Sequence, residues 1–301
     1  MSTLYAIGFD IGATNVKAVA VSSTGKTLRV EQFETGDKQD AWLHGTMAHL
    51  AAFEKELGNA DWIGIAAPGL AARDSRSIAW MQGRLAGLQD LDWTRQFERE
   101  HVVPVLNDAH AALIGELWLG AAKGARDAVL LTLGTGVGGA IVCDGRLLRG
   151  PLGRAGHLGH LSLDPNGQPD IVSTPGSLED AIGDHTVHDR CGGRFASTEA
   201  LVEAHRAGDQ VATQIWLRSV QCLAAAIASI INAVDPEVVI LGGGIARAGP
   251  ALFDPLERFL DDFEWRPNGH RVRVIPAALG DRAGAIGAAR FAMQFDRKEG
   301  E

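Results

Sequence analysis

The chain has 301 residues, with 46% hydrophobic and 22% charged residues and a formal net charge of −9 at pH 7. This length exceeds what one compact core usually holds, so we expect two domains in a globular protein. The acidic balance excludes nucleic acid and an anionic membrane surface as expected partners, because both attract basic faces.

The first predicted element is a strand–turn–strand around "GFDIGATNVK", residues 8–17, in which Asp10 ends one apolar strand. A tight hairpin would explain the glycines of this turn, because glycine adopts backbone angles that other residues avoid. A phosphate site would explain them equally, because backbone amides must approach an anion closely. The turn alone leaves both interpretations open.

A helix is expected over about 40–57, followed by an apolar strand and then by "PVLNDAHAAL", residues 104–113. Asn107 and Asp108 stand where a strand gives way to a helix. Both residue types favour the first position of a helix, so a helix cap is one interpretation. The other is that Asp108 accepts a proton from an attacking hydroxyl while Asn107 orients the substrate. The two roles are compatible.

The second half repeats the first. "AVLLTLGTGVGGAIVCDGRLL", residues 128–148, matches "AIGFDIGATNVKAVAVSSTGKTL", residues 6–28, element by element. We therefore predict two related halves, each a mixed sheet covered by helices, with a ligand between them. A long helix over about 209–234 contains the longest apolar run, whose 13 residues are too few to span a bilayer. Residues 161–208 are rich in loops and look like an insertion.

The two glycine turns differ from the common nucleotide motifs. Neither has the lysine of a P-loop, and "GTGVGG" leads into a strand instead of the helix that follows a dinucleotide fingerprint. Two β-hairpins that grip a polyphosphate from both sides are the arrangement of the actin-like ATPases. The three cysteines lack metal-ligand spacing and indicate reduced thiols in a cytoplasmic protein, and the first residues do not resemble a signal peptide.

Five motifs in order, between Ala6 and Ala289, resemble the ROK family of sugar kinases and related repressors. They are "DIGATNVKAV", "NDAHAA", "LGTGVGGAIV", "VVILGGGIARAG" and "LGDRAGAIGAA". The resemblance implies an α/β fold of two actin-like (ribonuclease H-like) domains with a cleft between them. We expect these domains at 1–117 and 118–301, with the last helix packing back on the first domain.

The resemblance also implies roles for particular residues. Asp108 would be the general base, and Asp10 would hold Mg²⁺ through ATP. The sugar contacts would be Gly69, Arg84, Asn107, Asp108, His157, His160 and Glu179. The ATP contacts would be Asp10, Gly12, Ala13, Thr14, Asn15, Thr135, Gly136, Gly243 and Gly244.

Three departures from the family pattern bear on the substrate and on metal. His157 stands where the family's E-x-G-H has glutamate, which exchanges a pure acceptor for a group that can donate. Arg84 replaces an asparagine that contacts sugar in relatives. The family's C-x-C-G-x-x-G-C-x-E, whose cysteines bind structural zinc with a histidine, reads "DIVSTPGSLE" here, with Ser177 at the last cysteine. Without sulfur ligands, we expect no structural zinc.

The resulting prediction is an ATP- and Mg²⁺-dependent sugar kinase, cytoplasmic and homodimeric, for which glucose is a poor substrate. A non-catalytic sugar-binding sensor, or a kinase of a sugar acid or polyol, stays open as an alternative. A repressor is not expected, because Asp10 lies too near the start of this sequence for a preceding DNA-binding domain.

Overall fold

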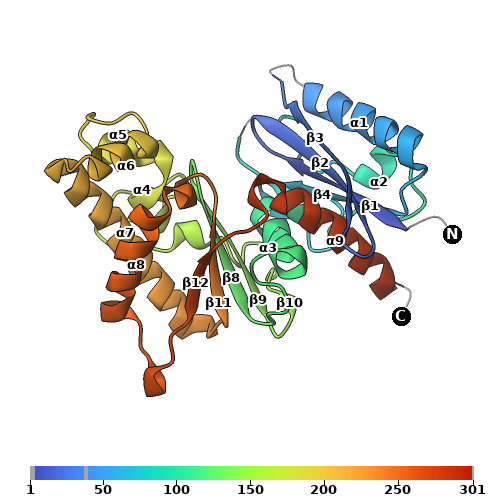
Figure 1. Cartoon of the computed structure of the whole chain (residues 1–301). Helices are drawn as coiled ribbons and strands as arrows, with labels where there is room; N and C mark the ends of the chain where they lie inside the picture. The colour runs from blue at the N-terminus through green and yellow to red at the C-terminus, as the bar shows by residue number, and fades with distance from the viewer. Residues whose placement is uncertain (1–3, 37–39, 84, 300–301) are drawn as a thin grey trace. The chain divides into compact units, whose positions relative to one another are not determined.

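The computed structural model describes residues 4–36, 40–83 and 85–299. These residues form two compact units (Figure 1). Unit 1 comprises the described residues up to Gly124, residues 147–155 and the described residues from Ala278 onward. Unit 2 comprises Ala125–Arg146 and Gly156–Ala277. The chain therefore enters unit 1 three times, and its last helix belongs there.

Unit 1 is built on a five-stranded sheet of order β3-β2-β1-β4-β7. β1 to β3 form antiparallel hairpins, whereas β4 and β7 are parallel to β1. Its strands are β1 (Tyr5–Ile11), β2 (Asn15–Ser22), β3 (Thr27–Glu34), β4 (Trp62–Ala67) and β7 (Val105–Asn107), beside a small ribbon of β5 (Leu70–Ala71) and β6 (Ile78–Trp80). Its helices are α1 (Ala41–Leu57), α2 (Trp93–Gln96), α3 (Asp108–Leu119), the short η5 (Gly280–Arg282) and α9 (Ala283–Glu299).

Unit 2 repeats this topology, with a five-stranded sheet of order β10-β9-β8-β11-β12. The pairing directions also agree, with β8 antiparallel to β9 and parallel to β11. The strands are β8 (Ala128–Leu133), β9 (Val137–Cys143), β10 (Arg146–Leu147), β11 (Val238–Gly242) and β12 (Arg273–Pro276). The helices are η1 (Leu158–His160), α4 (Leu178–Ile182), η2 (Asp184–Thr186), α5 (Val187–Arg190), α6 (Thr198–Arg206), α7 (Gln210–Val234), η3 (Ile245–Ala248), α8 (Pro250–Phe263) and η4 (Pro267–Gly269). The repeated order confirms the prediction of two related halves.

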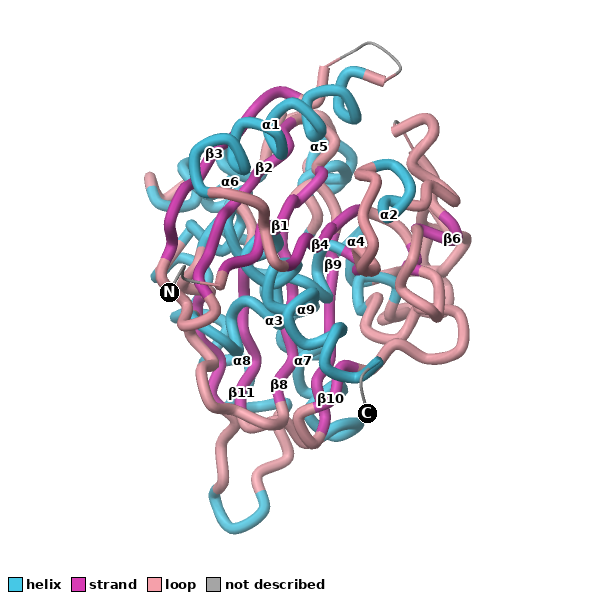
Figure 2. The backbone as a smooth tube through the Cα atoms, turned by 90° about the vertical axis from the view of Figure 1, so that its right-hand side faces the viewer, coloured by secondary structure: helices cyan, strands magenta, loops and turns pink. Residues whose placement is uncertain are grey.

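The alternation of side chains along β1 decides what each face of its sheet contacts. Ile7, Phe9 and Ile11 join a core with residues of α1 and α2. Ala6 lies on the opposite face and packs against α9. Asp10 has the parity of Ala6, so its carboxylate is on the face that packs against α9. Helix α9 in turn lies beside α3 (Figure 2).

The contact between α9 and the strands depends on small residues on both sides. A Cβ on Gly8 of β1 would lie 1.8 Å from the Ala285 carbonyl oxygen, and one on Gly64 of β4 would lie 2.2 Å from that of Ala288. On the other flank, a Cβ on Gly287 would lie 1.7 Å from the Ala111 carbonyl oxygen of α3. Only hydrogen fits at these positions, so α9 approaches the backbone of β1, β4 and α3 closely there.

A buried carboxylate holds the segment that leads into α9. The Glu116 side chain of α3 accepts hydrogen bonds from the backbone N–H groups of Ala121, Ala278 and Leu279. A buried carboxylate needs such donors, because burial removes the water that would otherwise solvate its charge. Glu116 therefore joins residues that are more than 160 positions apart in the sequence.

The long helix α7 is the central helix of unit 2. The Asp209 side chain caps the first turn of α7 by accepting a hydrogen bond from the Ala212 amide. The helix ends at Val234, and the next residue, Asp235, has a left-handed conformation and precedes Pro236. Within the described chain, α7 is the one helix long and apolar enough to cross a membrane, and half of that stretch is buried against the rest of unit 2. Burial of this kind is typical of a core helix.

Candidate active site

The first glycine turn joins β1 to β2 in unit 1. The Gly12 amide donates to the Asn15 carbonyl oxygen, and buried Thr35 holds the turn from behind through the oxygens of Gly12 and Thr14. Ala13 and Thr14 are exposed at its tip. The turn is thus rigid underneath and open above, which is what an anion-binding turn requires.

Asp10 lies at the base of this turn, against α9. A Cβ on Gly284 would be 2.6 Å from its Oδ2, so only glycine fits there. Burial raises the pKa of Asp10 to about 7, and the charges of Asp108 and Asp281 add to the rise while Lys17 opposes it. Because the charge of Asp108 acts on Asp10, the two predicted carboxylates lie near each other in unit 1.

Asn107 and Asp108 join β7 to α3. The Asn107 Oδ1 accepts from the amides of Ala109 and His110 at 2.9 and 3.2 Å, and its Nδ2 donates to the Gly69 carbonyl oxygen at 3.1 Å. Asn107 therefore caps the helix and ties it to the loop at Gly69.

The Asp108 carboxylate begins α3 and is accessible to solvent. The protein around the carboxylate displaces part of its water, and this desolvation raises the pKa of Asp108 above the usual range. Hydrogen bonds from the Ala109 amide and the Asn107 side chain act in the opposite direction. A general base works best with a pKa near the operating pH, so this rise suits the predicted role.

The second glycine turn joins β8 to β9 in unit 2. Residues of α4 and η2 contact this turn and hold it in place. The Glu179 side chain accepts from the Val137 amide at 2.8 Å, and a Cβ on Gly136 would be 2.4 Å from the same carboxylate. The amide of His185 and its Nδ1 both bond the Thr135 carbonyl oxygen. Glu179, which the sequence predicts as a sugar contact, positions the second glycine turn in the structure.

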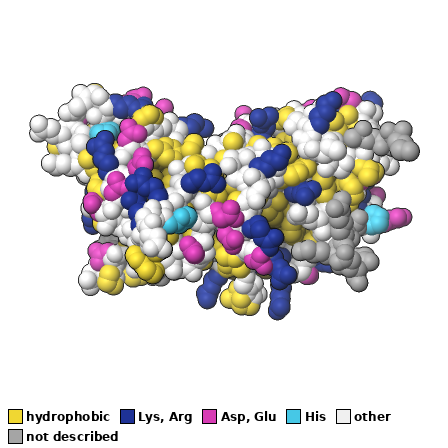
Figure 3. Space-filling view, turned by 60° about the horizontal axis from the view of Figure 1, so that its bottom comes forward, with side chains coloured by type: hydrophobic (Ala, Val, Ile, Leu, Met, Phe, Trp, Pro, Cys, Tyr) yellow, Lys and Arg dark blue, Asp and Glu magenta, His cyan; other side chains and the backbone are white. Residues whose placement is uncertain are grey.

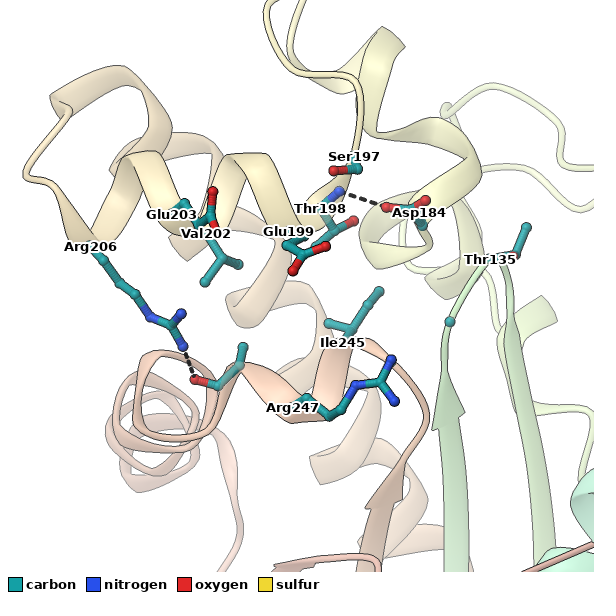
Figure 4. A pocket seen from close by; sticks show the side chains of 13 residues that line it. Thr135, Asp184, Ser197, Thr198, Glu199, Val202, Glu203, Arg206, Ile245 and Arg247 are labelled. Carbon is teal, nitrogen blue, oxygen red and sulfur yellow. Dashed lines mark hydrogen bonds between the residues drawn. The ribbon is translucent and has the colours of Figure 1, made fainter. Parts of the chain in front are cut away.

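A cavity of about 320 Å³ opens beside this turn (Figure 4). Its walls come from the turn at Thr135, from α6 and from η3, which follows β11. Gly243 brings β11 close to the turn, since it has φ of 86° and a Cβ there would be 2.3 Å from the Leu133 carbonyl oxygen. Gly244 lines the cavity. Unit 2 thus brings together Thr135, Gly243 and Gly244, which are three of the predicted ATP contacts.

The wall formed by α6 was not predicted. Glu199 and Arg206 of α6 and Arg247 of η3 line the cavity, Asp184 accepts from the Thr198 amide at its rim, and Arg206 donates to the Ala248 carbonyl oxygen (Figure 4). Asp184, Glu199 and Arg206 fall in the apparent insertion of residues 161–208, where the available signal was a capped amphipathic helix after Ser197. The cavity is near the lower end of the roughly 300–1,000 Å³ typical of small-molecule sites and suits a nucleoside.

The remaining predicted sugar contacts lie on the segment after β9. His157 is half-buried and directly precedes η1. η1 lies against β9 because Gly159 has no side chain, as a Cβ there would be 2.1 Å from the Val137 carbonyl oxygen. His160 ends η1, and its Nδ1 is 2.8 Å from Oδ2 of the buried Asp170. Arg84 lies outside the described residues.

The residues at the family's zinc positions do not form a metal site. Asp170, Val172 and Ser177 occupy the three cysteine positions, and the Ser177 hydroxyl instead accepts from the Asp180 amide and caps α4. Among the residues searched, those that the structure describes, no group of three or more His, Cys, Asp or Glu side chains could hold a metal ion. Zinc does not fit this donor set.

Comparison with known proteins identifies the family. The ROK family profile matches residues 6–295. A glucokinase from Thermotoga maritima is 33% identical over 96% of this chain and 97% of its own length, and an N-acetylmannosamine kinase from Escherichia fergusonii is 31% identical over 95% and 97%. The crystal structure of a ROK family glucokinase from Streptomyces griseus, in complex with glucose and AMPPNP, has a TM-score of 0.77 and 28% identity and covers 96% of this chain and 99% of that one. This chain, with its two actin-like α/β domains, belongs to the ROK family.

Proposed function

We propose that this protein transfers the γ-phosphoryl group of ATP to a hydroxyl of a hexose or a related sugar, with Asp108 as the general base. The enzyme class, an ATP-dependent carbohydrate kinase, follows from the family and from its curated relatives. The observation that carries the proposed mechanism is the position of Asp108, which directly follows β7, begins α3 and lies near Asp10. A carboxylate there can take the proton of an attacking hydroxyl.

The nucleotide assignment rests on features within each unit. In unit 1 the candidates are Asp10, Gly12, Ala13, Thr14 and Asn15, around the exposed tip of the first turn. In unit 2 they are Thr135, Gly136, Gly243 and Gly244, at the second turn and the cavity. The AMPPNP in the Streptomyces griseus relative supports ATP as the donor here.

We propose that magnesium binds together with the nucleotide beside Asp10, since the described side chains form no metal site of three or more ligands by themselves. Burial raises the pKa of Asp10, and the negative charges of Asp108 and Asp281 add to the rise. A divalent cation bound with the nucleotide would favour the ionised carboxylate and neutralise phosphate charge. Carboxylate oxygens are the ligand type that Mg²⁺ prefers.

The proposed sugar preference rests on positions where this chain differs from the ROK family pattern. His157 supplies a donor where relatives have glutamate, so we expect glucose to be a poor substrate despite the glucokinases among the relatives. The sugar contacts are assigned to Gly69, Asn107, Asp108, His157, His160 and Glu179. A sugar acid or polyol is the alternative acceptor, and a non-catalytic sugar sensor is the alternative function.

We further propose a homodimeric cytoplasmic enzyme that binds neither nucleic acid nor membrane and contains no structural zinc. The net charge of −9 supports the absence of polyanionic partners, and acidic and basic side chains are interspersed on the face in Figure 3.

The test is ADP release with Mg–ATP across hexoses, amino sugars, ketoses, sugar acids and polyols. Asp108→Asn is the control, since loss of a positioned base lowers turnover by about 10²–10⁴-fold while leaving ATP binding nearly unchanged. Turnover of Asp108→Asn within a few-fold of wild type would remove Asp108 from the mechanism. Sugar binding without ADP release by the wild type would favour the sensor.

A further inference from the structure

The loop of residues 161–177 is organised around one buried carboxylate. The Asp170 side chain has no exposed surface, whereas the His160 ring is 29% exposed. Asp170 Oδ1 accepts from the amides of Val172 and Thr174 at 2.9 and 2.8 Å, and Oδ2 faces His160 Nδ1 at 2.8 Å. Both carboxylate oxygens thus have partners, since backbone amides bond Oδ1 and an imidazole ring bonds Oδ2.

When Asp170 is ionised, its carboxylate must be the acceptor in the hydrogen bond with His160. Burial acts to raise the pKa of Asp170, but the hydrogen bonds from His160 and from the Thr174 and Val172 amides lower it below the usual value. A carboxylate can only accept, so His160 Nδ1 must carry the proton. In a neutral imidazole the other ring nitrogen, Nε2, then has a free lone pair and no proton.

A metal ion in the same place would have the opposite effect. A ligating nitrogen gives its lone pair to the metal, so the proton of a neutral imidazole stays on the other nitrogen. A carboxylate at Nδ1 therefore makes Nε2 an acceptor, where a metal at Nδ1 would make it a donor. Asp170 stands at one of the positions where zinc ligands would be expected, and zinc does not fit the residues present.

We propose that Asp170 is a positioning residue that fixes the Nδ1–H tautomer of His160, so that Nε2 accepts a hydrogen bond from a substrate hydroxyl. This inference rests on the proposed sugar-kinase function for the identity of the ligand. It gives the two histidines complementary roles, with His157 able to donate and His160 accepting. A substrate for this pair must present both a donor and an acceptor.

The test compares two substitutions in the same loop of the full-length chain. Asp170→Asn keeps Oδ1 for the Val172 and Thr174 amides but turns an NH₂ group toward His160 Nδ1, which favours the Nε2–H tautomer. Asp164→Asn is the matched control, because Asp164 is exposed and its side chain accepts only from the nearby Asn166 amide among the contacts described.

The first readout is the tautomer, measured by ¹⁵N NMR of the histidine rings without ligand. We expect the Nδ1–H form of His160 in the wild type and in Asp164→Asn, and the Nε2–H form in Asp170→Asn. An Nε2–H tautomer in the folded wild type overturns the proposal, whether or not any sugar is phosphorylated.

The second readout is the KM for glucose and for N-acetylmannosamine, with the KM for ATP and the melting temperature measured on the same samples. Asp170→Asn should raise the sugar KM about ten- to hundredfold, as expected when a polar pair is mismatched in a site, with the ATP KM unchanged. An unchanged sugar KM together with a switched tautomer overturns the role of Nε2. Failure of the wild type to use either sugar counts against the proposed substrate and leaves the tautomer result to judge Asp170.

Discussion

The proposal that glucose is a poor substrate depends on His157. At this position, which resembles a sugar contact, a histidine that can donate a hydrogen bond stands in place of a glutamate that can only accept one. His157→Glu should raise the ratio of kcat/KM for glucose to that for the preferred sugar, by about ten- to hundredfold. Steady-state kinetics on both sugars measures this ratio.

The control for this substitution is His188→Glu, which makes the same exchange at a side chain that is 68% exposed. It should leave the ratio unchanged. If the wild type already phosphorylates glucose as efficiently as any other sugar, His157 does not set the specificity.

Asp10 predicts a pH dependence of stability in the absence of nucleotide and metal. Its pKa is raised from the ordinary value of 3.8 to about 7, so the folded chain holds this proton more tightly than the unfolded chain. The protonated Asp10 therefore contributes to the free energy of unfolding, fully below pH 4, and this contribution is lost as the pH rises through 7. An asparagine at this position does not titrate, so the Asp10→Asn variant does not lose stability in this way.

Relative to wild type, Asp10→Asn should therefore gain about 2 kcal/mol more unfolding free energy at pH 8 than at pH 5. Urea unfolding at the two pH values measures the difference, with Asp164→Asn as the exposed control. A difference that is the same at both pH values would show that Asp10 is ionised throughout.

Asp10 and Asp108 could be predicted from the sequence because Asp10 lies near the end of an apolar strand and Asp108 directly follows one, and strand ends in α/β sheets collect polar side chains at one edge. The Asp170–His160 bond could not be predicted, since ten positions separate the two residues in a loop without periodicity. The bond depends on how the loop folds back on itself, which no local pattern encodes.

At the scale of elements, the packing of α9 gives the sharpest prediction. Gly287→Ala places a Cβ 1.7 Å from the backbone of α3, which cannot rotate away as a side chain can. The expected loss of unfolding free energy is about 3 kcal/mol, measured by chemical denaturation.

Gly45→Ala in α1 is the matched control, since that helix has the same length and the new Cβ would meet only the Phe33 side chain, 2.6 Å away. Phe33 can shift, and alanine favours a helix over glycine by about 1 kcal/mol, so the net change should be small. Equal losses from both substitutions would argue against the close backbone contact.

The loop of residues 161–177 is held by hydrogen bonds and not by sulfur ligands. Its ends are joined by the Leu163 amide to the Gly176 carbonyl oxygen and by the Ser162 hydroxyl to that of Pro175. Protein purified without added zinc should contain well under one zinc per chain, and a chelator should leave the melting temperature unchanged. Stoichiometric zinc by elemental analysis would contradict the prediction.

The elements themselves were largely predictable. The helices expected over about 40–57 and 209–234 are Ala41–Leu57 and Gln210–Val234. Gly58 marks the end of the first helix, and the Asp209 cap and an Asp-Pro stop mark the ends of the second. The cavity wall from α6 was not predicted, because it forms only when residues 197–206 pack beside the segment that follows β11.

At the scale of the whole molecule, unit 1 depends on a helix from the far end of the sequence. Removing residues 278–301 deletes α9 and leaves the faces of β1 and β4 at Gly8 and Gly64 uncovered. Amide hydrogen exchange should then lose protection in β1 and β4 while β8 and β11, in the core of unit 2, keep theirs. Full protection of β1 in the shortened chain would contradict this dependence.

The path of the chain has a consequence for synthesis on the ribosome. Unit 2 has all its segments once Ala277 has emerged, whereas the sheet of unit 1, made first, must wait for α9. Domains usually fold in the order of their synthesis, but here the half translated first is completed last. During translation the nascent sheet of unit 1 exposes an apolar face that a chaperone can bind. A premature stop codon near the end of the gene should therefore damage the half of the protein encoded at its beginning.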